Sequence, residues 1–217
     1  MENQKIINKT KNFVRKRLLE DASGHDWWHS YRVWKIGKKL ATEEKANVFL
    51  VELMCLLHDI ADYKLNNGDE MIGLKLAYDW LSKIGVEDSL IKLVTEGIQK
   101  ISFKGVDFEN KSLSIEEKCV QDADRLDALG AIGIARCFAF GGFNGNKIHN
   151  PKVSPRDKIT KEEYKKLNVT SINHFYEKLL HLKELMNTET AKNIAEKRHN
   201  FMKIYLEEFF KEWNFNS

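Results

Sequence analysis

Proline is scarce in this sequence of 217 residues, and its only two prolines, Pro151 and Pro155, lie close together. Because proline lacks a backbone N–H and interrupts helices, the rest of the chain is free to be helical. No segment of useful length alternates apolar and polar residues as a half-buried strand would. The sequence therefore predicts an all-α protein.

Cysteine is also scarce, and the three cysteines, Cys55, Cys119 and Cys137, form no CxxC pair. An odd number of widely spaced cysteines does not indicate a disulfide framework or a thiolate zinc site. Each cysteine lies in an apolar helical stretch, so we expect three buried thiols in a reducing compartment.

Long apolar runs are absent as well. The most apolar run, residues 48–57, includes Glu52 and is too short to cross a bilayer, so it predicts a buried helix. The N-terminal segment MENQKIINKTKNF has no apolar region typical of a signal peptide. We therefore expect a cytoplasmic protein with no membrane partner.

The charge balance shows no large excess of either sign, since 35 Lys and Arg residues face 32 Asp and Glu residues, a formal net charge of +3. Such a small excess does not indicate a nucleic-acid partner, although it allows a locally positive pocket for an anionic substrate. With 42% hydrophobic residues, the chain can bury a sizeable core. Its length suits a single domain over residues 1–217, as a monomer or a homodimer.

Apolar residues recur at helical spacing through much of the chain. The spacing predicts helices over 71–84, over 170–186 and in the C-terminal segment. Capping boxes at 114–117 and 160–163 predict two helix starts, because the hydroxyl and the carboxylate satisfy free backbone N–H groups. We expect the C-terminal helices, at about 160–217, to pack on the core formed by the rest of the chain.

The segment 141–159 is different, because it is rich in Gly, Asn and Pro and poor in aliphatic residues. A long loop of this kind is usually kept for function or left mobile. Its basic residues could meet a phosphate group, or they could belong to an ordinary solvated loop. These residues are Lys147, His149, Lys152 and Arg156.

Polar residues stand in three segments where a core would favour apolar ones. In the first, HDWWHSYR, helical spacing puts His25, His29 and Arg32 on one face. A single histidine in such a helix is more often a hydrogen-bonded core residue than a metal ligand.

In the second segment, His58 and Asp59 end the most apolar run. Their burial costs several kcal/mol unless a partner such as a divalent cation is present.

The third segment is QDADRLDA, in which Asp124 and Asp127 lie three residues apart and share a helix face. A cluster of acids is usually a solvated helix face. That interpretation fits poorly here, because the stretch that follows, LGAIGIARCFAF, carries a single charge, Arg136.

Together, His29, the adjacent His58 and Asp59, and Asp124 resemble the H…HD…D signature of the HD superfamily of metal-dependent phosphohydrolases. The segments HDWWHSYRV, LLHDIADYK and QDADRLDALGAIGIAR look like those of the small single-domain bacterial members, and the similarity extends through most of the chain. The resemblance implies an HD-domain helical bundle in which these four residues bind a divalent metal ion.

A set of two imidazoles and two carboxylates suits Mn²⁺, which we favour, or Mg²⁺, Ni²⁺, Co²⁺ or Fe²⁺. The resemblance implies that the ion lowers the pKa of a water molecule and binds a phosphoryl oxygen of the substrate. It also implies that Asp62 is a catalytic base or orients the attacking water, with helix capping or an ion pair as the alternative. We expect substrate contacts from His25, Arg32, Lys64 and Asp127, although Arg32 and Lys64 could equally have surface roles.

The predicted function is therefore that of a hydrolase that acts on a phosphorylated small molecule, most of all a nucleotide. We expect a nucleoside triphosphate to be cleaved between its α- and β-phosphates, which gives the monophosphate and pyrophosphate. Pyrophosphate is a better leaving group than a ribose oxygen, and no strong general acid is obvious in the sequence. The alternatives are a phosphomonoesterase, a phosphodiesterase, and a non-catalytic module that binds a nucleotide.

Overall fold

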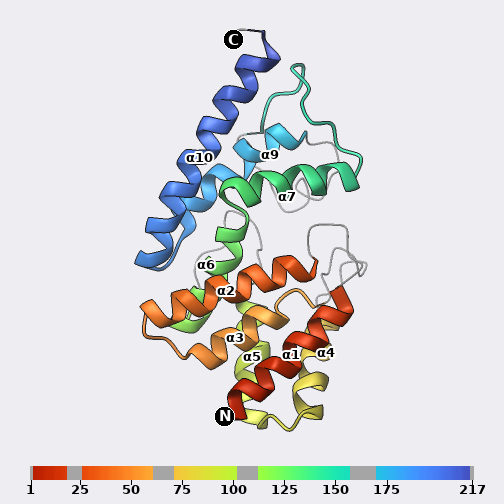
Figure 1. Ribbon diagram of the computed structural model, residues 1–217, viewed down its shortest axis with the longest axis vertical. Coiled ribbons are helices and arrows are strands. Elements are labelled where there is room, and N and C mark those ends of the chain that lie inside the picture. Colours follow the sequence, from red (N-terminus) through yellow and green to blue (C-terminus); the bar gives the residue numbers. More distant parts are fainter. Residues whose placement is uncertain (1, 19–25, 61–70, 102–111, 157–169, 216–217) are drawn as a thin grey trace. The chain divides into compact units, whose positions relative to one another are not determined.

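The structure, a computed structural model, describes residues 2–18, 26–60, 71–101, 112–156 and 170–215. Within these ranges the chain forms helices and their connections and no strand, as Figure 1 shows. The predicted all-α class is confirmed.

The described residues fall into two compact units, one that runs to Asp124 and one that begins at Arg125. Each unit has its own buried apolar residues. The single domain over 1–217, and the packing of its C-terminal helices on the core, stay predictions.

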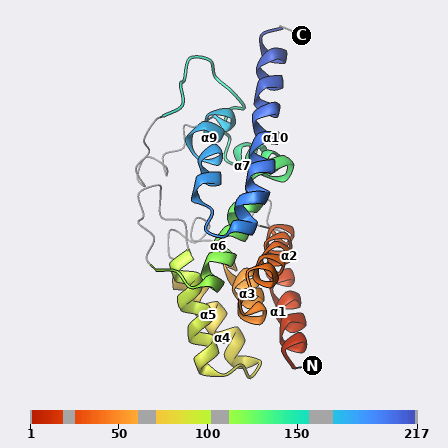
Figure 2. The ribbon, with the colours of Figure 1, turned by 90° about the vertical axis from the view of Figure 1, so that its left-hand side faces the viewer.

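The first unit is built around one apolar helix. Its helices are α1 (Glu2–Leu18), α2 (Trp27–Glu43), α3 (Val48–Leu57), α4 (Met71–Lys83), α5 (Asp88–Ile101) and the part of α6 (Ile115–Asp127) that ends at Asp124. Helix α3 is contacted by α1, α2 and α5, and α4 lies beside α5 (Figure 2). From Leu50 to Leu57 every residue of α3 is buried, as its sequence predicts for a central helix.

The carboxylate of Glu52 lies inside this apolar helix and has two partners. It accepts a hydrogen bond from Trp34 Nε1 at 2.9 Å and one from Lys38 Nζ at 3.2 Å. Because a buried charge is costly unless it is paired and hydrogen-bonded, these contacts allow Glu52 to remain in the core. They also tie α2 to α3.

Helices α2 and α3 approach each other closely at Gly37. A Cβ atom at this position would overlap Cys55 Sγ and would lie 3.3 Å from Val51 Cγ1. Glycine therefore permits the short distance between the two helices, which carry His29 and His58.

The capping box predicted at Ser114 begins α6. Ser114 Oγ accepts a hydrogen bond from the backbone N–H of Glu117 at 3.2 Å, and Glu117 Oε2 accepts one from the backbone N–H of Ser114 at 2.9 Å. The box predicted at Thr160 lies outside the described residues.

The second unit contains α7 (Gly130–Phe143), α9 (Ser171–Glu177), a 3₁₀-helix (Leu179–Leu185) and α10 (Glu189–Trp213). The helix predicted over 170–186 is not continuous, because the chain turns at Lys178 with φ of −141° and ψ of −58°. Four members of the predicted apolar face are buried, Ile172, Phe175, Leu179 and Met186, whereas Tyr176 is 37% exposed. The apolar spacing continues across the break and gave no sign of it.

Helix α7 continues to Phe143, past the predicted start of the loop at 141. The connection that follows is tied to α9. The backbone N–H groups of Ser171 and Ile172 donate to the carbonyls of Lys147 and Ile148. The Arg156 guanidinium binds the carboxylate of Glu177 through Nε and Nη2, at 3.0 and 2.8 Å.

His149, in the same connection, packs against the end of α10. Its ring lies edge-on to Phe209, Phe210 and Trp213, with centroids 6.0, 5.4 and 4.9 Å away. Two of the basic residues that could have met phosphate, His149 and Arg156, therefore have structural partners within this unit.

Among the described residues, no single helix has both the length and the apolar composition needed to cross a membrane. Helices α6 and α7 reach this length and apolar composition only when they are taken together, as a bent pair.

Candidate metal centre

His29 lies in the first turn of α2 and is completely buried. The turn is fixed by Asp26, whose carboxylate accepts a hydrogen bond from the backbone N–H of His29 at 2.8 Å. An aspartate at this position satisfies a backbone donor that the helix leaves free. Asp26 thus positions His29.

His58 and Asp59 come directly after α3. The Nδ1 atom of His58 lies 2.8 Å from the carbonyl oxygen of Cys55. A carbonyl only accepts hydrogen bonds, so Nδ1 carries the proton and donates it, and the lone pair of a neutral His58 is on Nε2. This arrangement is typical of histidines that bind metals, because the second hydrogen bond fixes the orientation of the ring.

Four donor atoms from three parts of the unit converge. His29 Nε2 lies 3.4 Å from Asp59 Oδ2 and 3.5 Å from Asp124 Oδ1. His58 Nε2 lies 3.5 Å from Asp59 Oδ2 and 3.8 Å from Asp124 Oδ1. Donor atoms of His29, His58 and Asp59 all lie within 4.8 Å of one another. The structure thus brings three of the predicted ligands, His29, His58 and Asp59, into one cluster, and it places the fourth, Asp124, beside both imidazoles.

The spacing of these atoms fits a divalent cation. Donor atoms bound at about 2.1 Å to one ion, at right angles, lie about 3 Å apart. The nitrogen–oxygen distances of 3.4 to 3.8 Å need only a small contraction to reach this value. A set of two nitrogens and two carboxylate oxygens, without a thiolate, suits ions of the manganese and iron type.

The electrostatics of the cluster also favour a positive charge at its centre. Burial alone would lower the pKa of His58, but the carboxylates of Asp59 and Asp124 outweigh it and raise the pKa to about 9. Partial burial raises the pKa of Asp124, but the hydrogen bond and charge of His58 outweigh it and hold the pKa well below the usual range. Carboxylates that attract a proton this strongly would attract a divalent cation at the same point.

The cluster is closed on its histidine side and open on its carboxylate side. The exposed fraction of the side chain is 0% for His29 and 6% for His58, but 23% for Asp59 and 45% for Asp124. A ligand can therefore reach a bound ion from the side of the two carboxylates.

The predicted substrate contacts differ from one another in their surroundings. Arg32 is half-buried on α2, one turn after His29. Asp127 lies in the second unit and is 1% exposed, and its Oδ2 lies 3.2 Å from Arg136 Nη1. Its carboxylate is thus part of a buried ion pair, and its role as a substrate contact stays a prediction.

Three predicted site residues, His25, Asp62 and Lys64, lie outside the described residues. The predicted catalytic role of Asp62 is therefore untested. The capping role of Asp26 was missed, although the signal was present as an aspartate three residues before His29.

Comparisons with known proteins identify the family. The HD-domain profile matches residues 27–129. The uncharacterised YpgQ protein of Bacillus subtilis is 37% identical over 213 residues, which cover 98% of this chain and 96% of YpgQ.

Several solved structures are similar to this chain in both sequence and fold. An HD-superfamily hydrolase from Bacillus thuringiensis is 47% identical, covers 98% of both chains and has a TM-score of 0.75. A Lactobacillus plantarum protein is 36% identical over 97% of both chains, with a TM-score of 0.86. YpgQ in complex with ADP is 34% identical, covering 95% of this chain and 97% of that one, with a TM-score of 0.75. The chain described above therefore belongs to the HD superfamily of hydrolases.

Proposed function

We propose that this protein is a metal-dependent nucleotide pyrophosphohydrolase, which cleaves a nucleoside triphosphate to the monophosphate and pyrophosphate. The observation that carries the proposal is the convergence of His29, His58, Asp59 and Asp124 at 3.4 to 3.8 Å, with exposure on the carboxylate side alone. The ADP complex of YpgQ, a relative over nearly the whole chain, supports a nucleotide as the ligand.

The four side chains would hold one divalent ion, with Mn²⁺ favoured. Such an ion, when bound, would supply Lewis-acid stabilisation of a phosphoryl oxygen and would lower the pKa of water beside it. His29 and His58 would fix its position from the buried side. Asp59 and Asp124 would neutralise its charge and leave the exposed side to the substrate.

Asp62 is proposed to take up the proton of the attacking water. Its position in the sequence, three residues after Asp59, supports this role. Cleavage next to the α-phosphorus releases pyrophosphate, a leaving group that needs no strong general acid. The cleavage of a phosphomonoester would need one, to protonate a departing alkoxide.

Product analysis tests the proposal. A panel of nucleoside triphosphates, monophosphates and cyclic nucleotides is incubated with Mn²⁺, and the products are separated by anion-exchange chromatography. Equal amounts of nucleoside monophosphate and pyrophosphate are expected. Stepwise release of orthophosphate, or hydrolysis of monophosphates alone, would indicate a phosphomonoesterase, and hydrolysis of cyclic nucleotides alone a phosphodiesterase. Binding without turnover under any metal would indicate a non-catalytic module.

A further inference from the structure

Two lysine side chains converge over one buried aromatic ring where α1 meets α2. Lys11 Nζ lies 4.4 Å from the centroid of the Trp34 ring, and Lys35 Nζ lies 5.7 Å from it. Lys11 comes from α1 and Lys35 from α2. The electron-rich π-system of the indole attracts each of the two ammonium groups.

The charges of these two groups are not neutralised by the ring, because an indole carries no net charge. Nearby Lys38 differs, since its Nζ lies 3.2 Å from the carboxylate of Glu52. For Lys11 and Lys35, no carboxylate lies within ion-pair distance in the part of the chain that the structure describes. Within the described residues, two positive charges thus lie near the Trp34 ring without a carboxylate at ion-pair distance.

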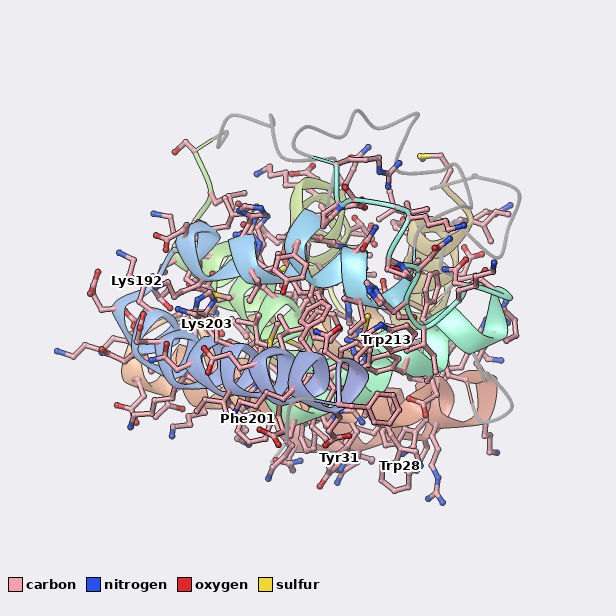
Figure 3. All side chains as sticks on the ribbon, turned by 90° about the horizontal axis from the view of Figure 1, so that it is seen from above. Trp28, Tyr31, Lys192, Phe201, Lys203 and Trp213 are labelled. Atoms are coloured by element: carbon pink, nitrogen blue, oxygen red, sulfur yellow. The ribbon has the colours of Figure 1, made fainter. Side chains whose placement is uncertain are left out.

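A row of aromatic rings leads away from this point along α2. The Tyr31 ring lies 5.6 Å from the Trp34 ring, and the Trp28 ring lies 5.9 Å from Tyr31, edge-on at 82°. Trp28 is 57% exposed, and Figure 3 shows its side chain beside that of Tyr31. The exposed fraction of Trp28 means that part of its indole is open to solvent.

This face of α2 is not the one that carries the metal ligand. At about 100° per residue, Trp28 and Lys35 point roughly 100–120° away from His29 around the helix axis. His29 is fully buried, whereas Trp28 and Lys35 are exposed. The side chains of Trp28 and Lys35 therefore leave α2 in a different direction from that of His29.

We propose that the surface formed by Lys11, Tyr31, Trp28 and Lys35 is a second nucleotide site, which binds a nucleoside di- or triphosphate. The nucleobase would stack on the open indole of Trp28, and the phosphates would bind the two ammonium groups. Trp28 and Trp34 are six residues apart, about 9 Å along the helix. That span suits one nucleotide with an extended phosphate chain.

The size of the surface favours a single nucleotide over a nucleic-acid strand. Single-strand sites usually contact about four or more nucleotides along a basic groove with several stacking side chains. Here one exposed indole and two ammonium groups, which have no carboxylate at ion-pair distance in the described ranges, provide for one base and one phosphate group.

The test measures the binding of ATP to the full-length protein in excess EDTA, by isothermal titration calorimetry. Without divalent ions, binding through the metal centre and hydrolysis are both suppressed. The variant K11Q/K35Q is expected to bind ATP at least about tenfold more weakly than the wild type, since two charge-assisted contacts are lost. The matched control K92Q, an exposed lysine on α5, should bind as the wild type does.

Trp28 is tested separately, because its contribution is stacking. W28A should weaken ATP binding, and W28F, which keeps an aromatic face, should retain most of it. Adenosine and inorganic phosphate alone should bind much more weakly than ATP. Circular dichroism establishes that each variant is folded.

Three results would overturn the proposal. ATP could fail to bind in EDTA, or it could bind to K11Q/K35Q as tightly as to the wild type. An oligothymidylate could bind more tightly than ATP and lose this binding in K11Q/K35Q, which would make the surface a single-strand site. None of these measurements depends on turnover, so the outcome is separate from that of the proposed hydrolase activity.

Discussion

The four converging side chains differ in hydrogen bonding and in exposure, and these differences suit them to different roles in metal binding. His58 donates a hydrogen bond to the Cys55 carbonyl, which leaves its Nε2 lone pair directed at the cluster. Asp124 is the most exposed of the four, with a side chain that is 45% accessible. The histidines thus form the rigid base of the centre, and the carboxylates form its accessible side.

Replacing Asp59 should remove the metal, whereas replacing Asp62 should not. Asp59→Ala deletes an oxygen that lies 3.4 and 3.5 Å from the two imidazole nitrogens. Asp62→Asn would keep the four ligands and lower turnover alone. Elemental analysis of both purified variants, with a parallel rate measurement, checks the distinction. Equal loss of metal in both would contradict separate roles for the two carboxylates.

The three thiols should be unreactive in the folded protein. Burial raises the pKa of Cys119 to about 12 and that of Cys137 to about 12, and it also raises the pKa of Cys55. At pH 8 a thiol with a pKa of about 12 is deprotonated in roughly one molecule in ten thousand, and only the thiolate reacts. A disulfide reagent should therefore titrate no thiol in native buffer and three in denaturant. Rapid labelling of the native protein would show that the helices open more easily than their burial indicates.

At the scale of the elements, polar residues in apolar helices indicated which segments could form the centre, and the resemblance to the HD signature then selected the four predicted ligands. His58 and Asp59 follow a helix that is buried from Leu50 onward, and Asp124 precedes an apolar stretch. The break at Lys178 could not be predicted, because the apolar spacing continues across it. The break is a change of backbone dihedral angles at Lys178, which the spacing of apolar residues does not encode.

The connection between α7 and α9 should depend on the ion pair of Arg156 with Glu177. Glu177 is 7% exposed, and it accepts hydrogen bonds from the Arg156 backbone N–H and guanidinium. Arg156→Ala would remove the guanidinium and leave the buried carboxylate of Glu177 short of hydrogen-bond donors, which costs about 1–3 kcal/mol. Urea denaturation measures the free energy of unfolding. Lys152→Ala, in the same connection, serves as the control and should change it by less than about 0.5 kcal/mol.

At the scale of the whole molecule, a metal that binds only the folded state stabilises the protein by mass action. All four proposed ligands lie in the unit that ends at Asp124, and they come from parts of the chain that are far apart in sequence. One ion would therefore link the beginning, middle and end of that unit.

Thermal unfolding with and without Mn²⁺ should show this link. At a hundred times the dissociation constant, a bound ion contributes about 2.7 kcal/mol to the free energy of unfolding. We expect Mn²⁺ to raise the melting temperature of the wild type and EDTA to reverse the increase. Asp59→Ala should show no response. An equal rise in the variant would mean that the ion binds elsewhere.

The close packing at Gly37 makes the effect of two substitutions, one at Gly37 and one at Cys55, depend on which of them arises first in evolution. A methyl group there collides with Cys55 Sγ, while the next atoms, Val51 Cγ1 and Ala123 Cβ, lie at 3.3 and 3.5 Å. Gly37→Ala as a first step would require the Cys55 side chain, or the backbones of α2 and α3, to move. If Cys55→Ala comes first, the obstructing sulfur is gone, and alanine at 37 meets only a tight contact. The same two substitutions are therefore harmful in one order and tolerable in the other, so that a buried cysteine whose thiol is not among the proposed metal ligands governs which descendants of this sequence are accessible.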